Sequence, residues 1–427
     1  MNSQSLEPVV VDVLISGGGM VGMTLACALA DAGVAVALVD AEAPELLLDA
    51  GHDGRASAIA YGSHRILSGI GAWADMAPDA EPILEIRVSD GDGRGRTSPL
   101  FLHYDHQELA GRVEAAIAGA PPFGWIVENR AIRRALLARV ASLPGLVHMA
   151  PAKVLEQTRG HGGVTATLDT GATVRAQLAV AAEGKNSPMR RAAGIPVTEW
   201  AYPQTGIVCT IGHELPHEGV AHEHFTPSGP FAVLPMTTTE DGHRSSIVWT
   251  ERNEIAPAMM ALSDEAAAEE IMRRFGHSLG RIRILSRRWT YPLKLMHAAR
   301  YVDERLALVG DAAHVIHPIA GQGLNLGLRD VAALAEAIVD ARRLGLDVGQ
   351  ADVLARYERW RRFDTMMLLA VTDSLNRLFS NDVALIRLAR DLGLAAVDRL
   401  PPLKRLFMRH AMGLVGDLPR LVRGERL

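Results

Sequence analysis

The stretch that most constrains the fold is a run of three glycines at residues 17–19, between an apolar strand pattern and a helical one. Residues 9–16 alternate into an apolar strand, residues 17–22 follow with four glycines, and a helical stretch then runs to Ala32. A second apolar strand, residues 34–39, ends at Asp40. The order strand, glycine turn, helix, strand and acid is typical of a βαβ unit that binds a dinucleotide.

Each glycine of this turn has its own expected role. Gly17 permits the turn, Gly19 admits a pyrophosphate to the helix N-terminus, and Gly22 lets helix and strand pack closely. Asp40 stands where an acid would accept hydrogen bonds from the hydroxyls of an adenosine ribose. The alternative is a glycine-rich loop without a ligand. The predicted cofactor-binding residues here are Gly17, Gly19, Met20, Val21, Gly22 and Asp40.

A lone carboxylate marks a second strand-to-helix segment, residues 306–328. The segment starts with an uncharged run, residues 306–309, which is typical of a strand buried on both faces. Asp311 would stand at the carboxyl end of that strand, where open α/β sheets bind ligands, and could accept hydrogen bonds from a sugar-like hydroxyl. The alternative is a tight strand-to-helix turn with a solvated aspartate.

The loop after Asp311 leads through two glycines into a helix. Pro318 stiffens the loop, and Gly321 and Gly323 would let the backbone approach a flat ligand closely. A helix beginning near Leu324 would direct free N–H groups and its positive dipole end at that ligand, which would stabilise a ring that becomes anionic on reduction. The predicted site residues of this segment are Pro318, Gly321, Gln322, Gly323, Leu324 and Asn325.

Length and composition limit the remaining possibilities. At 427 residues the chain exceeds one compact core and suggests two or three domains. A net charge of -5 argues against nucleic acid as the main partner, and two cysteines cannot form a disulfide framework, which favours a reducing compartment. Glycines interrupt the longest uncharged run, residues 13–30, and no base precedes it. We therefore expect neither a transmembrane helix nor a cleaved targeting segment.

Two further stretches of the first half contain candidate site residues. Residues 53–73 are expected to form a helix ending near Trp73, and Arg55 at its start fits a surface cation as well as a binding site. Strand and turn signals at residues 82–97 predict a hairpin of a second domain. Asn129 precedes a helix with regularly spaced apolar residues, and it fits a ligand contact or a helix N-cap.

The middle of the chain predicts one more buried strand and then a β-rich domain. The strand, residues 177–182, ends in Glu183 and Gly184. Between residues 204 and 250, β-rich runs separated by Gly and Pro suggest a mostly antiparallel sheet, the expected floor of a substrate pocket. Four histidines of this stretch lie on strands and loops without a cysteine cluster, so no metal site is predicted. They are His213, His217, His222 and His224.

The last third of the chain predicts helices, one of them from Ser263 to Phe275. Residues 384–427 contain nine Lys or Arg against four Asp or Glu, an excess of five positive charges. Such cations, interleaved with Leu and Phe407, can lie on an anionic membrane surface at about 1 kcal/mol each. A helical cap with a solvated basic face is the alternative. The cations concerned are Arg387, Arg390, Arg399, Lys404, Arg405 and Arg409.

The glycine turn, the Glu-Gly pair at residues 183–184 and the segment around Asp311 occur in the order of three flavin fingerprints. On these residues the chain resembles the class A flavoprotein aromatic monooxygenases. The resemblance implies an α/β protein of the p-hydroxybenzoate hydroxylase fold, with a Rossmann-type FAD-binding domain, a β-rich substrate domain and a C-terminal helical segment. The expected domains are residues 1–75, 100–195 and 288–345 for FAD, residues 76–99 and 196–287 for substrate, and residues 346–427 for the helical region.

A narrower resemblance covers most of the chain and is to the bacterial ubiquinone-biosynthesis hydroxylases. The segments that resemble this family are YGSHRILSGIG, VENRAIRRALL, YPQTGIVCTI, TPSGPFAVLPM, YPLKLMHAARYV, HPIAGQGLNLGLRDV and VTDSLNRLF.

This resemblance implies roles for the candidate residues. Asp311 would hold the ribityl chain of FAD, and the loop after Pro318 would lie along the flavin ring. Arg55 would lie beside the flavin and the pyrophosphate, and Asn129 would lean over the ring. The pair at residues 183–184 would serve the flavin and nicotinamide pyrophosphates, with a glutamate where the family usually has aspartate.

The implied enzyme is an FAD-dependent monooxygenase that hydroxylates the ring of a polyprenylated phenol through a flavin hydroperoxide, with O2 and electrons from NAD(P)H. This chemistry needs no protein nucleophile, so no catalytic residue is predicted, and His317 is a candidate phenol contact. Expected partners are the phenol and either other ubiquinone-biosynthesis proteins or the membrane, at the cytoplasmic face of which the enzyme would lie. The alternatives are another FAD-dependent oxidoreductase or aromatic hydroxylase, or a non-catalytic lipid-binding subunit of a membrane complex.

Overall fold

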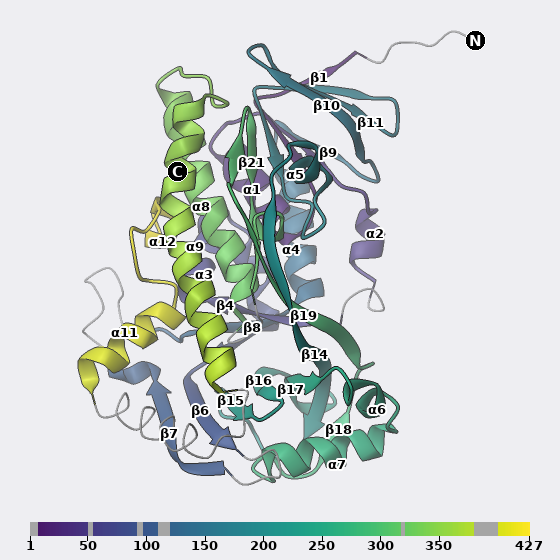
Figure 1. Ribbon diagram of the computed structural model, residues 1–427, viewed down its shortest axis with the longest axis vertical. Coiled ribbons are helices and arrows are strands. Elements are labelled where there is room, and N and C mark those ends of the chain that lie inside the picture. Colours follow the sequence, from purple (N-terminus) through teal and green to yellow (C-terminus); the bar gives the residue numbers. More distant parts are fainter. Residues whose placement is uncertain (1–6, 50–53, 92–96, 110–119, 317–320, 380–399) are drawn as a thin grey trace.

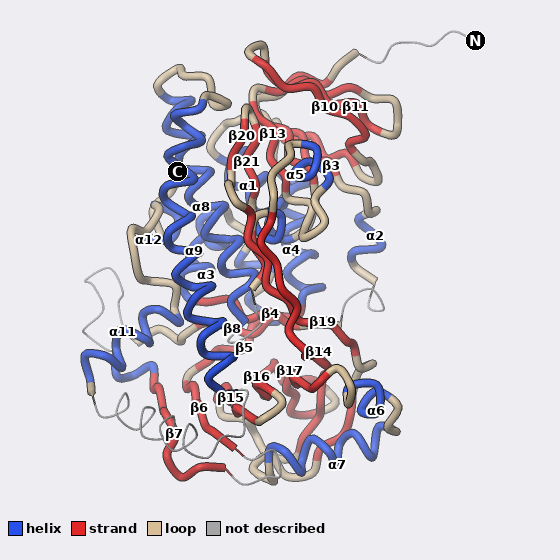
Figure 2. Tube along the Cα trace, viewed as in Figure 1, coloured by secondary structure: helices blue, strands red, loops and turns tan. Residues whose placement is uncertain are grey.

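The computed structural model describes residues 7–49, 54–91, 97–109, 120–316, 321–379 and 400–427 (Figure 1). A parallel sheet with helices packed against it forms one end of the molecule, and a large antiparallel sheet forms the other (Figures 1 and 2). Two long strands, β14 (Val197–His213) and β19 (Trp289–Ala298), pair with each other and run between the two ends. The chain is a mixed α/β protein, as predicted.

The first end contains a six-stranded sheet in the order β20-β21-β13-β2-β3-β9. All neighbours are parallel except β20 and β21. Strands β2, β3, β13 and β21 are fully buried, as expected for apolar strands covered on both faces. The bounds are Val13–Ser16 (β2), Val36–Val39 (β3), Leu146–Met149 (β9), Leu178–Ala181 (β13), Val302–Asp303 (β20) and Leu306–Leu308 (β21).

Three helices pack around this sheet, and the central one, α1, contacts both of the others. The predicted apolar positions Ile132, Leu136 and Val140 of α4 are buried in the shared core, whereas Leu137 is half-buried. The helices are α1 (Met20–Asp31), α4 (Asn129–Ser142) and α8 (Gln322–Arg343).

The other end is a nine-stranded sheet in the order β22-β19-β14-β17-β16-β15-β6-β7, with β18 also paired to β14. Every pairing is antiparallel except β15 with β6, which confirms the mostly antiparallel sheet. The hairpin predicted at residues 82–97 is the pair β6 and β7. Further bounds are Glu85–Gly91 (β6), Thr97–Asp105 (β7), Val220–Thr226 (β15), Gly229–Thr239 (β16), Gly242–Arg252 (β17), Ile282–Ile284 (β18) and His314–Val315 (β22).

Helices α6 (Ala256–Met260) and α7 (Asp264–Phe275) cover one face of this sheet. Ile271 of α7 is buried in one cluster with Phe231 and Ile247 of the strands. The predicted helix start is confirmed, because the Ser263 hydroxyl accepts the N–H of Ala266 at 3.2 Å.

The single strand predicted at residues 9–16 is wrong, because two strands of different sheets replace it. β1 (Val9–Val10) pairs with β12 in a four-stranded sheet, whereas β2 enters the parallel sheet. The chain changes partner at Asp12, whose carboxylate accepts the N–H of Ala35 at 2.9 Å. The remaining strands of the four-stranded sheet are β10 (Val154–Gly160), β11 (Gly163–Leu168) and β12 (Thr173–Ala176).

The helix predicted over residues 53–73 is also wrong in its first half. Residues Ala56–Ala60 form a strand, β4, and the helix α3 runs only over Tyr61–Gly69. β4 pairs with β8 (Gly124–Glu128), which pairs with β5 (Ala80–Ile83) on its other side. Long-range pairing therefore overrides the helical preference of an alanine-rich stretch. Asp53, at the start of the predicted helix, lies outside the described residues.

The C-terminal part is helical, as predicted, and packs on the first end of the molecule. Met408, Met412 and Leu421 are buried in the same core as the parallel sheet. Trp360 donates its Nε1–H to the Asp417 carbonyl at 2.7 Å. None of the described helices is long and apolar enough to span a bilayer. The helices are α9 (Ala351–Phe379), α11 (Pro401–Ala411) and α12 (Arg420–Arg423), and short helices elsewhere are α2 (Pro44–Leu47) and α5 (Pro188–Ala192).

Candidate cofactor site

Four parallel neighbours, β21, β13, β2 and β3, end at one edge of the six-stranded sheet. The residues that follow them are Gly310 and Asp311, Glu183, Gly17 and Asp40, in the same order. Sequence positions up to 294 residues apart thus meet at the carboxyl edge, where ligands of open α/β sheets bind. The structure brings the three predicted fingerprints together there.

The glycine turn after β2 packs closely against neighbouring backbone at Gly17 and Gly22 but leaves free space at Gly19. Gly17 has a φ of 107°, and a Cβ there would lie 2.4 Å from the Ala182 carbonyl oxygen. A Cβ at Gly22 would lie 1.9 Å from the Gly17 oxygen, so the predicted helix-to-strand contact is present. Gly19 differs, because it is exposed and a Cβ on it would meet nothing within 4 Å. Space for a pyrophosphate therefore exists where the sequence predicts it.

The N-terminus of α1 has the features of an anion site. The helix begins at Met20, after Gly19, with no side chain capping it and no acidic residue in its first turn. Its free N–H groups and positive dipole end thus face the open space at Gly19. Val21 has a packing role as well, because its side chain is the nearest neighbour to a Cβ built on Gly310 (3.2 Å) or Gly327 (2.7 Å).

Asp40 lies against the glycine turn. A Cβ on Gly18 would lie 2.3 Å from its Oδ2, and the N–H of Glu42 donates to its Oδ1 at 3.2 Å. Burial raises the pKa of Asp40 above its ordinary value. A half-buried carboxylate one strand away from the glycine turn fits an acceptor for ribose hydroxyls.

Asp311 has an accessible side chain, yet enough of the chain surrounds it that burial raises the pKa of its carboxyl. Interactions with His314, Arg55 and Lys185 lower that pKa, so these three groups are near. Arg55, predicted from a distant segment, thus lies near Asp311.

Arg55 and Asn129 are brought together by the pairing of β4 with β8. The Asn129 N–H donates to the Arg55 carbonyl at 2.9 Å, and the guanidinium of Arg55 lies over the Tyr291 ring at 4.6 Å. The Asn129 side chain accepts the Ser57 hydroxyl at 2.6 Å and is buried. Asn129 is the first residue of α4, whose cap position is Glu128, so the N-cap alternative does not hold.

The start of α8 lies beside β4. Gly321 has a φ of 61° and would place a Cβ 2.9 Å from that of Ala58, whereas Gly323 faces open space. The Asn325 amide donates to the carbonyls of Ala58 (2.8 Å) and Gly321 (3.0 Å) and accepts the Ala60 N–H at 2.9 Å. Its side chain donors are thus used within the protein. Gln322 and Leu324 are half-buried, and the predicted contacts Pro318 and His317 lie outside the described residues.

Glu183 uses its longer side chain to join two segments. Its Oε1 accepts the Ser16 hydroxyl at 2.7 Å, and its Oε2 accepts the Ser187 hydroxyl at 2.6 Å and the Met189 N–H at 3.1 Å. These contacts fasten the end of β2 to α5. Gly184, the next residue, has a φ of 76° and lies in the turn between β13 and α5.

A buried charge network beneath the Asp311 turn was missed by sequence reasoning. Asp330 of α8 accepts the Gly310 N–H at 3.0 Å and the His314 ring at 2.6 Å with one oxygen, and Arg361 Nε at 2.8 Å with the other. Burial would raise the pKa of Asp330, but His314 and Arg361 hold it below its ordinary value. The network fixes the backbone next to Asp311 and ties it to α9. Its members lie on separate elements, so no local spacing pattern in the sequence points to them.

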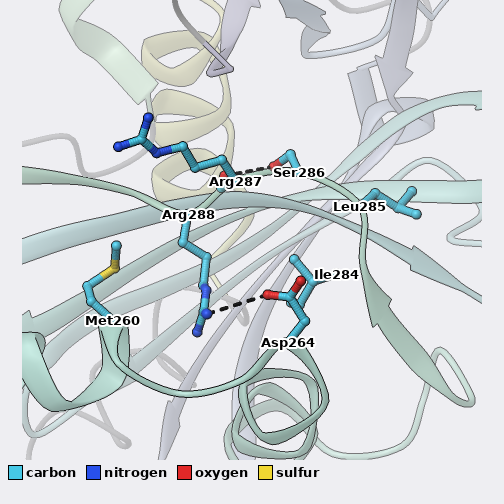
Figure 3. Close-up of a pocket in the computed structure, with 7 residues that line it drawn as sticks. All are labelled: Met260, Asp264, Ile284, Leu285, Ser286, Arg287 and Arg288. Atoms are coloured by element: carbon cyan, nitrogen blue, oxygen red, sulfur yellow. Dashed lines mark hydrogen bonds and ion pairs between the residues drawn. The ribbon is translucent and has the colours of Figure 1, made fainter. Parts of the chain in front are cut away.

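A cavity of about 510 Å³ lies at the opposite end of the molecule and is not this site (Figure 3). Its lining comes from α6, α7 and residues 284–288. Arg288 points toward Asp264, 3.4 Å away, and Arg287 points away from Asp264 (Figure 3). None of the predicted cofactor residues lines it, so it does not compete with the carboxyl edge.

Three of the four histidines in and beside the antiparallel sheet form hydrogen bonds with protein groups. His213 contacts the Ser245 hydroxyl at 3.0 Å, His217 the Met236 carbonyl at 3.0 Å, and His224 the Ser89 hydroxyl at 2.8 Å. His222 packs edge-on against a phenylalanine ring of α7. Among the described residues, no group of three or more potential ligands is arranged to hold a metal ion.

Comparisons with known proteins agree with this geometry. A family model described as an FAD binding domain matches residues 10–366. The ubiquinone hydroxylase UbiL of Rhodospirillum rubrum is 53% identical over 98% of this chain and 94% of its own length. The 3-demethoxyubiquinol 3-hydroxylase of Escherichia coli is 33% identical over 94% of this chain and 98% of its own.

A solved structure supports the fold assignment. The p-nitrophenol 4-monooxygenase of Pseudomonas putida DLL-E4 superposes with a TM-score of 0.77 at 20% identity, covering 96% of this chain and 99% of its own. The glycine turn, the open helix N-terminus and the Asp311 turn suit FAD, and the relatives match nearly end to end. The chain therefore belongs to the family of FAD-dependent ubiquinone-biosynthesis hydroxylases.

Proposed function

We propose that the protein is an FAD-dependent monooxygenase that hydroxylates the aromatic ring of a polyprenylated phenol in ubiquinone biosynthesis. The observation that carries this proposal is a relative named as a ubiquinone hydroxylase, 53% identical over 98% of the chain. The open space at Gly19 and the Asp311 turn add a site that fits FAD. NAD(P)H is the proposed electron donor and O2 the oxygen source.

When bound, FAD supplies the oxygen chemistry, and the protein's residues bind and orient. The α1 N-terminus would hold the pyrophosphate, Asp40 the adenosine ribose and Asp311 the ribityl chain. Arg55, fixed over Tyr291, would lie beside the flavin, and the start of α8 would stabilise negative charge on the ring. Glu183 would act through Ser16 and α5, because its oxygens are engaged there.

Turnover with a prenylated phenol tests the proposal. Purified protein with FAD, NADPH and O2 should convert the phenol to a product heavier by one oxygen atom. NADPH oxidation that yields only hydrogen peroxide, with the phenol recovered unchanged, would contradict the assignment.

We further propose that the enzyme docks on the membrane through apolar side chains of α11 and α9. Helix α11 buries a charged side chain and exposes apolar ones. Lys404 is only 8% exposed and pairs with Glu108 at 2.8 Å, whereas Leu406 is 51% exposed and Phe407 is 42% exposed. Lys404 is therefore not available to lipid, which corrects its place among the predicted membrane cations. Arg387, Arg390 and Arg399 of that set lie outside the described residues.

Helix α9 adds a second exposed apolar group next to α11. Phe363 is 73% exposed, and Met366 and Met367 are about half exposed. His410, at the end of α11, lies close to α9, because Asp364 of α9 partly offsets the lowering of the His410 pKa by burial.

Arg359, Arg362 and Arg409 are exposed on these two helices. Apolar residues flanked by cations suit the surface of an anionic bilayer, where a prenylated substrate resides. The docking face is defined as Phe363, Met366, Met367, Leu403, Leu406 and Phe407.

Replacing Leu403, Leu406 and Phe407 together with Ser should weaken binding to anionic liposomes, measured by co-sedimentation, by on the order of a thousandfold, since roughly 1.5 kcal/mol is lost per apolar side chain withdrawn from lipid and about 1.4 kcal/mol is a factor of ten. Flavin content should be unchanged. The matched control is the Ser triple variant of Leu46, Leu155 and Leu344, which lie elsewhere and are 49%, 64% and 75% exposed. Equal liposome binding by both variants and the parent would contradict docking through α11.

A further inference from the structure

The nine-stranded sheet has an inner face turned toward the proposed flavin elements. Arg244 of β17 lies 3.6 Å from Glu128 of β8, and β8 pairs with β4, the strand after Arg55. Alternate residues of a strand share a face, so Val248 lies on the inner face with Arg244. Ile247 lies on the opposite face, in the cluster with α7.

The strand register places one residue from each of six strands in a row across this inner face. The row is Val208 (β14), Val248 (β17), Ala232 (β16), Glu223 (β15), Val88 (β6) and Leu102 (β7). Glu223 is the only ionisable member, and it lies between Ala232 and Val88. Val248, Glu223 and Val88 are half-buried, whereas Ile247 on the other face is fully buried. The other three members, Val208, Ala232 and Leu102, are buried. The row is therefore an apolar surface that is partly accessible at Val248, Glu223 and Val88.

Glu223 makes no hydrogen bond or ion pair with any residue in the described part of the chain. Burial alone raises the pKa of its carboxyl to about 7. The side chains on either side of it, His222 and His224, point to the opposite face, where they contact Phe275 and Ser89. An unpaired carboxyl in an apolar wall is costly unless a ligand uses it, and such groups mark functional sites.

Other charged groups near this space are engaged elsewhere. Arg244 lies beside Glu128, and Asp373 of α9 accepts the Tyr202 hydroxyl at 2.7 Å. Asp90, on the same face of β6, has its own partner. Glu223 is thus a proton acceptor available to a substrate.

We propose that Glu223 is a catalytic residue that accepts the proton of the substrate phenol. The phenol O–H bond breaks, its proton moves to a carboxylate oxygen of Glu223, and the electron pair stays on the phenol oxygen. The resulting phenolate raises the electron density of the ring, which favours hydroxylation. When the hydroxylated ring loses its C–H proton to water and regains aromaticity, the protonated Glu223 returns its proton to the phenol oxygen. The inference rests on the proposed hydroxylase function.

The test compares FAD-loaded parent with Glu223→Gln in binding and in rate. The probe is 4-methoxyphenol, which stays neutral between pH 5 and 9 and whose O–H donates best to a carboxylate. Its affinity for the parent should rise as pH increases through about 7, because Glu223 ionises there. The parent's kcat/KM for a prenylated phenol should rise over the same range. Glu223→Gln should bind the probe with a pH-independent Kd, and its kcat/KM should fall about 100-fold or more and lose that rise.

Two variants sharpen the result. Glu223→Asp keeps a carboxyl and should retain a pH-dependent Kd, whereas Glu240→Gln, in the exposed turn after β16, should match the parent. If Glu223→Gln keeps the pH dependence of both Kd and kcat/KM, the inference is wrong. If pH-linked probe binding is lost in Glu223→Gln but even the parent hydroxylates no phenol, the proposed function fails and the binding role of Glu223 stands.

Discussion

Gly19→Val is expected to abolish FAD binding while leaving the fold intact. A Cβ at Gly19 meets nothing within 4 Å, and the residue has an extended backbone (φ -66°, ψ 175°) that valine adopts readily. The added methyl groups would instead fill the space at the α1 N-terminus that a pyrophosphate needs. Flavin absorbance per protein after reconstitution should fall from near one equivalent to about zero, with far-ultraviolet circular dichroism unchanged.

Gly160→Val is the matched control, because Gly160 also faces open space and lies in a strand remote from the carboxyl edge. This variant should bind FAD as the parent does. Stoichiometric FAD in Gly19→Val would show that the cofactor does not use the α1 N-terminus.

Asp311→Ala should weaken FAD binding by about 1.5 to 3 kcal/mol, roughly 10- to 100-fold in Kd, because a ribityl hydroxyl would lose a charged acceptor. The apoprotein should be little affected, since the Asp311 side chain is accessible and its neighbours Gly310 and His314 are held by Asp330. Fluorescence titration of the flavin measures the change.

The same variant should lose part of the stabilisation by ligand. FAD at 100 times its Kd stabilises a protein by about 2.7 kcal/mol, and a 100-fold weaker Kd at the same concentration leaves about 0.4 kcal/mol. Asp311→Asn, which keeps an acceptor without the charge, should lie between parent and Asp311→Ala. An FAD-induced rise in Tm as large as that of the parent would refute this role for Asp311.

The sequence predicted those parts of the site whose signals are local. Gly17, Gly22 and Gly321 occupy positions where backbone crowding or a positive φ excludes larger residues, and such constraints are visible in a single segment. The strand before Asp311 could be predicted because a short run buried on both faces must be apolar. Helix α7 was predicted correctly from its cap, since Ser263 bonds to the N–H of a residue only three positions away.

The missed parts depend on partners far apart in sequence. Asp330 reaches Arg361 on another helix, and Glu183 reaches Ser16 across 167 positions, so neither contact leaves a spacing pattern. Strand β4 was missed because its alanines favour a helix and only pairing with β8 makes it a strand. Lys404 was assigned to a surface from its charge alone, but tertiary packing buries it beside Glu108.

Turnover in ¹⁸O₂ tests the central claim most directly. The purified, FAD-loaded protein would be supplied with NADPH and a prenylated phenol, and the product analysed by mass spectrometry. The account predicts one added oxygen atom on the aromatic ring, labelled from ¹⁸O₂, and no such product from Gly19→Val. A ring oxygen derived from water, or product formation by protein that holds no flavin, would contradict FAD-dependent monooxygenation.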